Sequence, residues 1–168
     1  MPETTRRLFF DTVALSNFAL AGRLEVLVAR YGVCLQITNE VLDEISDGVA
    51  AGHGALAGIL ALAAAGAVSV TGLETAEREL YVELLRTLGP GEASCIAAAA
   101  SRKGVVVSDD RAARAGCTEC NVPFTGTIGI LKACCRDGVL SADTADEILA
   151  AMIAQGFYSP VQRLSHLL

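Results

Sequence analysis

Carboxylates follow two short hydrophobic runs in this sequence. Asp11 comes directly after the apolar residues 8–10, and the pair Asp109-Asp110 follows three valines and a serine at 105–108. Both runs are predicted to be buried strands, and the carboxyl ends of parallel strands meet at one edge of a sheet, where ligands bind. Acidic groups brought together there repel one another unless a cation lies between them. Carboxylate oxygens without nearby histidine favour Mg²⁺ or Mn²⁺ over zinc.

Two glutamates are further candidates for the same cluster. Glu44 lies on the helix predicted after the second strand, and Glu92 lies at the start of an apolar helix, where the helix dipole tolerates a negative charge. Each also has a simpler interpretation, because Glu44 can be ordinary surface and Glu92 can be a first-turn acid. Asp109 or Asp110 can likewise serve only as the cap of the helix that follows.

These acids must be positioned by alternating strands and helices. Such alternation predicts an α/β fold, with a parallel sheet and helices on both faces. Thr38 or Asn39 is the predicted cap of the third helix, and Ser141 that of the last one. We expect strands at 7–10, 33–37, 67–70, 105–107 and 122–124, and helices at 15–21, 23–30, 39–49, 55–65, 74–88, 92–101, 111–115, 128–136 and 142–155.

Composition limits the class of protein. The 168 residues fit one domain, and 52% of them are hydrophobic, which is typical of a globular chain. The net charge of −6 argues weakly against an indiscriminate nucleic-acid binder, but the carboxylates of the predicted site account for much of it.

The apolar residues before Asp11 are too few for a signal peptide. The apolar segment 55–73 is rich in alanine and interrupted by glycines, so we expect a cytoplasmic protein without a membrane span.

Six cysteines leave one alternative open. Without a secretion signal we expect them to be reduced thiols. The pair Cys117-x-x-Cys120, with Cys134 and Cys135, allows a structural zinc site, but adjacent cysteines are poorly placed to chelate one ion. Packing as small hydrophobic side chains is the favoured interpretation.

Four acidic blocks in this order resemble the PIN-domain family. They are Phe10-Asp11-Thr12, Val41-x-x-Glu44-Ile45, Gly91-Glu92-x-x-x-Ile96-Ala97 and Val107-Ser108-Asp109-Asp110-x-x-Ala113-Arg114. The stretch from Thr125 to Leu131, with Gly138-Val139-Leu140, resembles a prokaryotic branch related to VapC-like toxin ribonucleases. The resemblance implies a three-layer α/β/α sandwich around a parallel sheet of about five strands, the usual sheet size. It also implies metal-dependent cleavage of phosphodiester bonds, usually in RNA, and in many members a homodimer.

The resemblance also suggests a role for each residue. Mg²⁺ or Mn²⁺ held by Asp11, Glu92 and Asp110, with Glu44 as a further ligand or outer base, would activate water and neutralise the scissile phosphate. Many relatives have Asp where this chain has Glu92, and matching the family's Thr-x-Asp pattern favours Asp110 over Asp109 as the ligand. The residues expected to contact RNA through hydroxyls, free N–H groups or positive charge are Thr12, Ser108, Thr125, Thr127 and Arg114, with Arg111 and Lys132 as further candidates.

Two biological interpretations remain open. One is the toxin of a toxin–antitoxin pair, and the other is a catalytically silent PIN-like module that binds a protein partner or RNA. A silent module tends to lose one of its acids, whereas here every block retains one. The sequence therefore favours the enzyme.

Overall fold

A parallel sheet forms the centre of the molecule. In a computed structural model, which describes residues 6–168, five strands pair in the order β3-β2-β1-β4-β5, and every pairing is parallel. This confirms the predicted α/β class and the number of strands. The strands are β1 Leu8–Phe10, β2 Leu35–Thr38, β3 Ser69–Thr71, β4 Val105–Val107 and β5 Phe124–Thr125.

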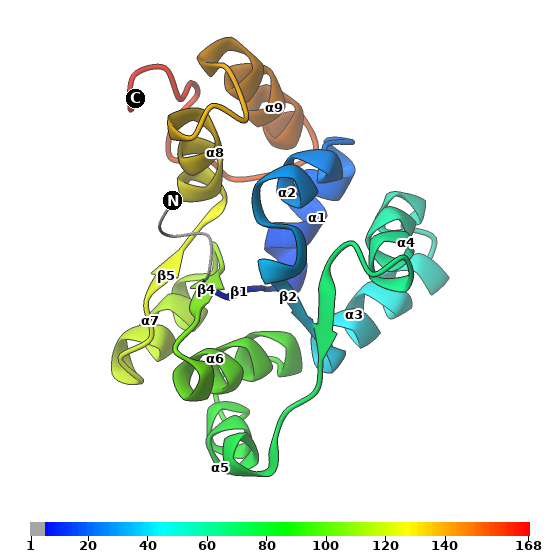
Figure 1. The fold of residues 1–168 in the computed structure, drawn as a ribbon, viewed down its shortest axis with the longest axis vertical. Helices are drawn as coiled ribbons and strands as arrows, with labels where there is room; N and C mark the ends of the chain where they lie inside the picture. The colour runs from blue at the N-terminus through cyan, green and yellow to red at the C-terminus, as the bar shows by residue number, and fades with distance from the viewer. Residues whose placement is uncertain (1–5) are drawn as a thin grey trace.

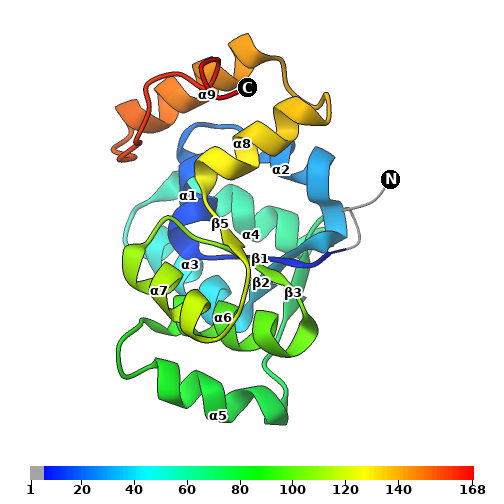
Figure 2. The same ribbon diagram turned by 90° about the vertical axis from the view of Figure 1, so that its left-hand side faces the viewer.

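Helices cover both faces of this sheet. Figures 1 and 2 show α1, α2, α8 and α9 on one side of the sheet and α5, α6 and α7 on the other, with α3 and α4 beside β2 and β3. This is the three-layer arrangement that the sequence predicted. The helices are α1 Thr12–Leu20, α2 Leu24–Tyr31, α3 Asn39–Ala50, α4 Ala57–Ala64, α5 Thr75–Leu84, α6 Pro90–Arg102, α7 Arg111–Glu119, α8 Thr127–Arg136 and α9 Ala142–Ala154.

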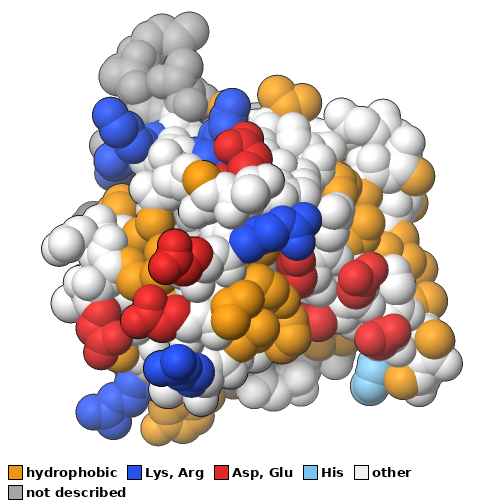
Figure 3. Space-filling view, turned by 90° about the horizontal axis from the view of Figure 1, so that it is seen from below, with side chains coloured by type: hydrophobic (Ala, Val, Ile, Leu, Met, Phe, Trp, Pro, Cys, Tyr) orange, Lys and Arg blue, Asp and Glu red, His pale blue; other side chains and the backbone are white. Residues whose placement is uncertain are grey.

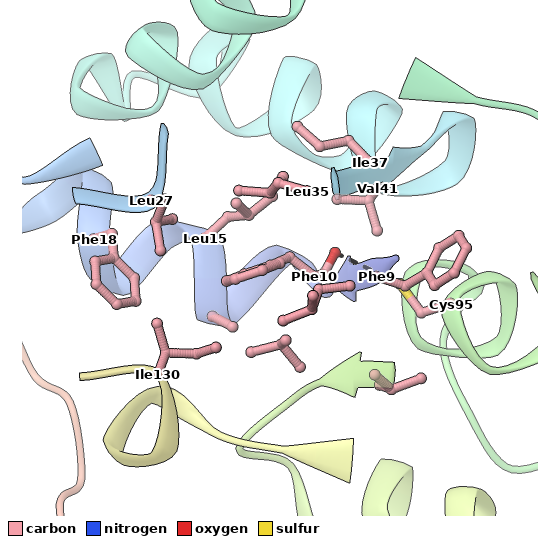
Figure 4. Packing of buried hydrophobic residues seen from close by; sticks show 14 of the residues in the cluster. Phe9, Phe10, Leu15, Phe18, Leu27, Leu35, Ile37, Val41, Cys95 and Ile130 are labelled. Atoms are coloured by element: carbon pink, nitrogen blue, oxygen red, sulfur yellow. Dashed lines mark hydrogen bonds between the residues drawn. The ribbon is translucent and has the colours of Figure 1, made fainter. Parts of the chain in front are cut away.

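Strands β1 and β4 are apolar along their whole length because they lie inside the sheet, with helices on both faces. Phe9 and Phe10 of β1 have no exposed surface, and β1 pairs with β4 in a register that sets Phe10 opposite Val107. Figure 4 shows Phe9 and Phe10 on the two sides of β1, with Cys95 of α6 beside the strand. Continuous hydrophobic runs of this kind are typical of the inner strands of a parallel sheet. The register places the residues after Phe10 and Val107 side by side.

Several helices begin at the residues that the sequence marked as caps. Thr38 caps α3 and Ser141 caps α9 through their hydroxyls. Asp110, one of the two predicted candidates, caps α7, and Asp11, which was not predicted as a cap, caps α1; each accepts a hydrogen bond from the backbone N–H three residues later. Two of the proposed catalytic acids therefore have a structural role as well.

Several element boundaries differ from the predicted ones: the helix predicted from residue 15 begins at Thr12, and the one predicted over 111–115 continues to Glu119. Residues 32–34 form a 3₁₀ turn that starts at Gly32, whose φ is +50°, so β2 begins two residues late. The predicted helix over 74–88 ends at Leu84. Pro90 occupies the first turn of α6, so that helix starts two residues before Glu92.

Two further expectations concern membranes and cysteines. No single helix within residues 6–168 is long and apolar enough to cross a membrane; one pair of consecutive segments, Thr12–Leu20 and Leu24–Cys34, passes by length and composition but is bent by 119°. All six cysteines are free thiols, and Cys95, Cys117 and Cys134 are buried in the core.

Candidate active site

Asp11 lies at the carboxyl end of β1 and is the most buried acid of the candidate site. Its backbone N–H donates to Val107 O (3.0 Å), and its Oδ1 accepts from Ala14 N (2.8 Å). The residue is only 2% exposed, and its Oδ2 is buried with no hydrogen-bond partner among the described residues. A buried carboxylate oxygen without a partner is unfavourable, so this atom is suited to bind a proton or a cation.

Glu44 connects the start of α1 to the start of α6. Its Oε1 accepts from Gly91 N (2.9 Å), and its Oε2 accepts a short hydrogen bond from the Thr12 hydroxyl. Thr12 directly follows Asp11, and Gly91 directly precedes Glu92. Glu44 therefore lies between the two other acids, and both of its oxygens are already engaged.

Glu92 lies in the first turn of α6. Its Oε2 accepts from Gly89 N at 3.3 Å, so the side chain binds the backbone of the residue that precedes this helix. Partial burial raises the pKa of Glu92, and the neighbouring charges of Asp110 and Glu44 raise it further. Glu92 is thus within electrostatic reach of two other predicted site acids.

Asp109 and Asp110 differ in how far their oxygens are engaged. Asp109 accepts from Thr127 N (2.9 Å) with Oδ1 and from Thr127 Oγ1 (2.5 Å) with Oδ2, and its Oδ1 lies 3.7 Å from Arg114 Nη2. Asp110 is exposed, and only its Oδ1 is used, by Ala113 N at 2.8 Å. Asp109 anchors the start of α8, whereas Asp110 retains an oxygen for another partner.

The pKa of Asp11 reflects this crowding. Burial, the largest cause, raises the pKa of Asp11 to about 6, and the charges of Asp109 and Glu92 contribute in the same direction. The nearby Ser108 hydroxyl and the Ala14 N–H lower it in part. Asp11, Glu92 and the acids around them therefore share one region, at the carboxyl ends of β1 and β4. Perturbed carboxylates of this kind are common at functional sites.

The acids do not form a ready-made metal site. Within residues 6–168, no group of three or more His, Cys, Asp and Glu side chains is arranged to hold an ion. The acids that the sequence predicted to converge lie within electrostatic reach of Asp11, but they are not arranged around one point. The physical reason is that carboxylates without a counter-ion repel one another and turn to nearby N–H and O–H donors. The oxygens that remain, on Asp11, Glu92 and Asp110, are hard donors that suit Mg²⁺ or Mn²⁺.

Three of the hydroxyls that we expected to contact RNA bind the acidic residues of the site. The Thr12 hydroxyl donates to Glu44, Ser108 Oγ accepts from Asp110 N (3.1 Å), and the fully buried Thr127 binds Asp109. Thr125 and Arg114 line a groove beside Asp109. Arg111 is exposed at the start of α7, and Lys132 lies on α8.

Two positions in the site carry weak sequence signals. Asn17 is buried in α1, and its Nδ2 donates to Thr127 Oγ1 at 3.2 Å and lies 3.5 Å from Asp109 Oδ2. A single amide in a helix without charged residues was the only signal for it. Gly126 lies so close to Asp109 Oδ1 and Arg114 Nη2 that a Cβ there would displace both side chains. Glycine allows this close approach because it has no side chain.

Gly91→Ala is expected to displace Glu44. The added Cβ would lie 2.5 Å from Glu44 Oε2, so the carboxyl group must leave Thr12 and the N–H of residue 91. We expect a loss of about 1 kcal/mol in stability and about tenfold slower cleavage, as when an outer-shell partner of a metal ligand is lost. Urea denaturation and an RNA cleavage assay would measure these effects. Gly54→Ala is the control, since nothing lies within 4 Å of its Cβ; equal activity of the two variants would contradict the role of Glu44.

Asp11 is expected to make stability depend on pH in the absence of metal. Its pKa is about 6 in the fold and 3.8 ordinarily, so the folded state binds the proton more tightly than the unfolded state. The resulting stabilisation is present below 3.8 and is lost as the pH rises to about 6. Urea denaturation in EDTA should therefore show Asp11→Asn gaining stability over the wild type across this interval. A difference that does not vary with pH would contradict the raised pKa.

Comparison with known families agrees with this geometry. The DUF3368 family model, described as a PIN domain, matches residues 7–168. A comparison with curated proteins finds no match. PIN domains are generally nucleases that use divalent metals, and the matched region includes every acid described above. The parallel five-stranded sheet and the match over nearly the whole chain show that this protein belongs to the PIN-domain family.

Proposed function

We propose that this single-domain chain is a metal-dependent ribonuclease. Asp11, Glu92 and Asp110 would hold Mg²⁺ or Mn²⁺, while Glu44 and Asp109 position the elements that carry them. The observation that carries the proposal is the buried, unpartnered Oδ2 of Asp11 beside other acids. A cation is the partner that such an oxygen lacks, and carboxylates at the carboxyl ends of parallel strands lie where ligands of α/β proteins bind.

Each residue contributes a defined part of the chemistry. Bound ions would supply activation of water and neutralisation of charge on the scissile phosphate. Asp11 is largely deprotonated above about pH 6 and can then act as a ligand. Glu92 is partly exposed, so the oxygen that does not bind Gly89 N can reach an ion, whose charge would offset the neighbouring negative charges that raise the pKa of Glu92. Arg114, 39% exposed at the rim, can hold a backbone phosphate.

The biological setting extends this proposal. A VapC-like toxin role, an antitoxin partner, a homodimer and a cytoplasmic location all follow from the resemblance noted in the sequence. They predict that the chain elutes as a dimer and that a small partner protein suppresses its activity. The catalytic proposal does not depend on them.

Cleavage of labelled single-stranded RNA in Mn²⁺ would test the activity. We expect cleavage with Mn²⁺ or Mg²⁺, none in EDTA, and recovery when the metal is added back, because the carboxylates need the ion to approach a phosphate. Single-stranded DNA of the same base sequence is the control for the sugar. Cleavage that persists in EDTA would contradict the metal requirement, and equal cleavage of DNA would contradict specificity for RNA.

A further inference from the structure

A large basic cavity lies away from the carboxylates. Its volume is about 900 Å³, and it lies over the amino-terminal ends of β1 and β4, between α2 and α8. No described Asp or Glu lines it, although the chain has a net charge of −6. We call it the basic pocket; its cationic residues are Arg6, Arg30, Lys132 and Arg136, of which Arg30 and Arg136 each pair with Asp137.

Arg30 offers an unused donor in the basic pocket. Its side chain is 7% exposed, and its guanidinium lies 4.8 Å from the centre of the Tyr31 ring. Nη2 pairs with Asp137 Oδ2 at 2.5 Å, but Nε is buried and has no hydrogen-bond partner among the described residues. A buried guanidinium N–H without an acceptor is rare, and the acceptors that suit it best are the oxygens of phosphates and carboxylates.

A second cavity adjoins this pocket and reaches Asp109, at the edge of the candidate active site. Its volume is about 420 Å³, and it begins at Asp109 and Arg114. It shares Lys132 and three other residues with the basic pocket, so the two cavities adjoin along α8. We call it the aromatic groove, because its lining includes Phe124, Phe157 and Tyr158.

The aromatic groove has the chemistry of a single-strand binding surface. Phe124 is 38% exposed, with the Arg114 guanidinium 5.5 Å from its ring centre, and Tyr158 is 94% exposed. Lys132 makes no ion pair with any residue that the structure describes. Exposed aromatic rings stack on unpaired bases, and basic residues between them follow the phosphates.

We propose that the aromatic groove and the basic pocket together bind the RNA strand on one side of the cleaved bond. Bases stack on Phe124 and Tyr158, and Lys132 and Arg30 bind phosphates of the same strand. This deepens the proposed ribonuclease function and rests on it, since the groove begins at Asp109. The proposal requires a single-stranded substrate, because bases inside a duplex cannot stack on side chains. By contrast, the face seen in Figure 3 mixes acidic, basic and hydrophobic side chains.

Binding can be measured without cleavage by using Asp11→Asn as the background. Fluorescence anisotropy with a labelled RNA of about 12 nucleotides, within the range of single-strand sites, would give the affinity. We expect Lys132→Glu to weaken binding about tenfold and to reduce the salt dependence by about one phosphate contact. The matched control is Arg78→Glu, which makes the same change of charge on exposed α5, in the opposite layer. Equal affinities of these two variants would overturn the proposal.

The aromatic contribution has its own test. Tyr158→Ala should weaken binding about fivefold, the smaller stacking effect seen on alanine substitution, whereas Tyr158→Phe should bind as the parent does. Equal loss in both would contradict stacking. A mononucleotide that competes with the labelled RNA for binding would support a pocket that binds the end of the strand. One that does not compete would overturn the basic pocket.

The two proposals can fail separately. Metal-dependent cleavage by the wild type, with no effect of Lys132→Glu on RNA binding, would refute the groove and leave the ribonuclease standing. Binding that depends on Lys132 and Tyr158, without any cleavage, would refute the enzyme and leave an RNA-binding surface.

Discussion

Asp11→Asn is expected to lower metal-dependent RNA cleavage about 10²- to 10³-fold, the effect of removing a few kcal/mol of electrostatic stabilisation from the transition state. Asparagine keeps the oxygen that accepts from Ala14 N, so α1 retains its cap. It loses the negative charge and replaces the unpartnered Oδ2 by an amide nitrogen, which cannot bind a cation. The initial rate of cleavage of labelled RNA in saturating Mn²⁺ is the measurement.

The control for this variant is Asp43→Asn. Asp43 is an exposed acid on α3, so the substitution makes the same change of charge next to Glu44 without altering a proposed ligand. It should cleave at the wild-type rate. Equal cleavage by Asp11→Asn and the wild type would indicate a contaminating nuclease or a different site, and the proposed function would then be wrong. Far-UV circular dichroism should be the same for all three proteins.

Glu77→Ala is expected to destabilise the fold by about 3–5 kcal/mol, because it leaves a partly buried arginine without its partner. Glu77 is 1% exposed and accepts from Arg102 Nε (2.7 Å) and Nη2 (2.8 Å). Arg102 also donates to Thr71 Oγ1 and Gly72 O, each at 2.7 Å. The pair therefore connects α5, α6 and the end of β3. Urea denaturation would give the change in the free energy of unfolding.

Glu79→Ala is the matched control on the same helix. Glu79 is exposed, and removing it should change stability by no more than about 0.5 kcal/mol. Hydrogen bonds and the charge of Arg102 hold the pKa of Glu77 below its ordinary value against the opposing effect of burial. The stabilisation that this gives is present above the ordinary pKa and is lost as the pH falls through the lowered one. A loss below about 1 kcal/mol for Glu77→Ala would show that the pair is not a structural support.

The sequence by itself determined the centre of the fold. The runs at 8–10 and 105–107 are apolar without alternation, which predicts inner strands of a parallel sheet. The acids that follow each run must then emerge at the same edge, because parallel strands end together there. For this reason the proximity of Asp11 to Asp109 could be inferred without coordinates.

Only the tertiary structure decided which oxygens remain for a ligand. Asp109 is bound by Thr127, Arg114 and Asn17, which come from three different helices. Its neighbour Asp110 accepts only from Ala113 N, in the helix that it caps. Glu44 is likewise engaged by residues that are distant in sequence. The ion pair of Glu77 and Arg102 and the junction of the two cavities at Lys132 arise in the same way. The physical reason is that spacing along the chain specifies local periodicity and caps, whereas the partner of each polar atom depends on how separate elements pack.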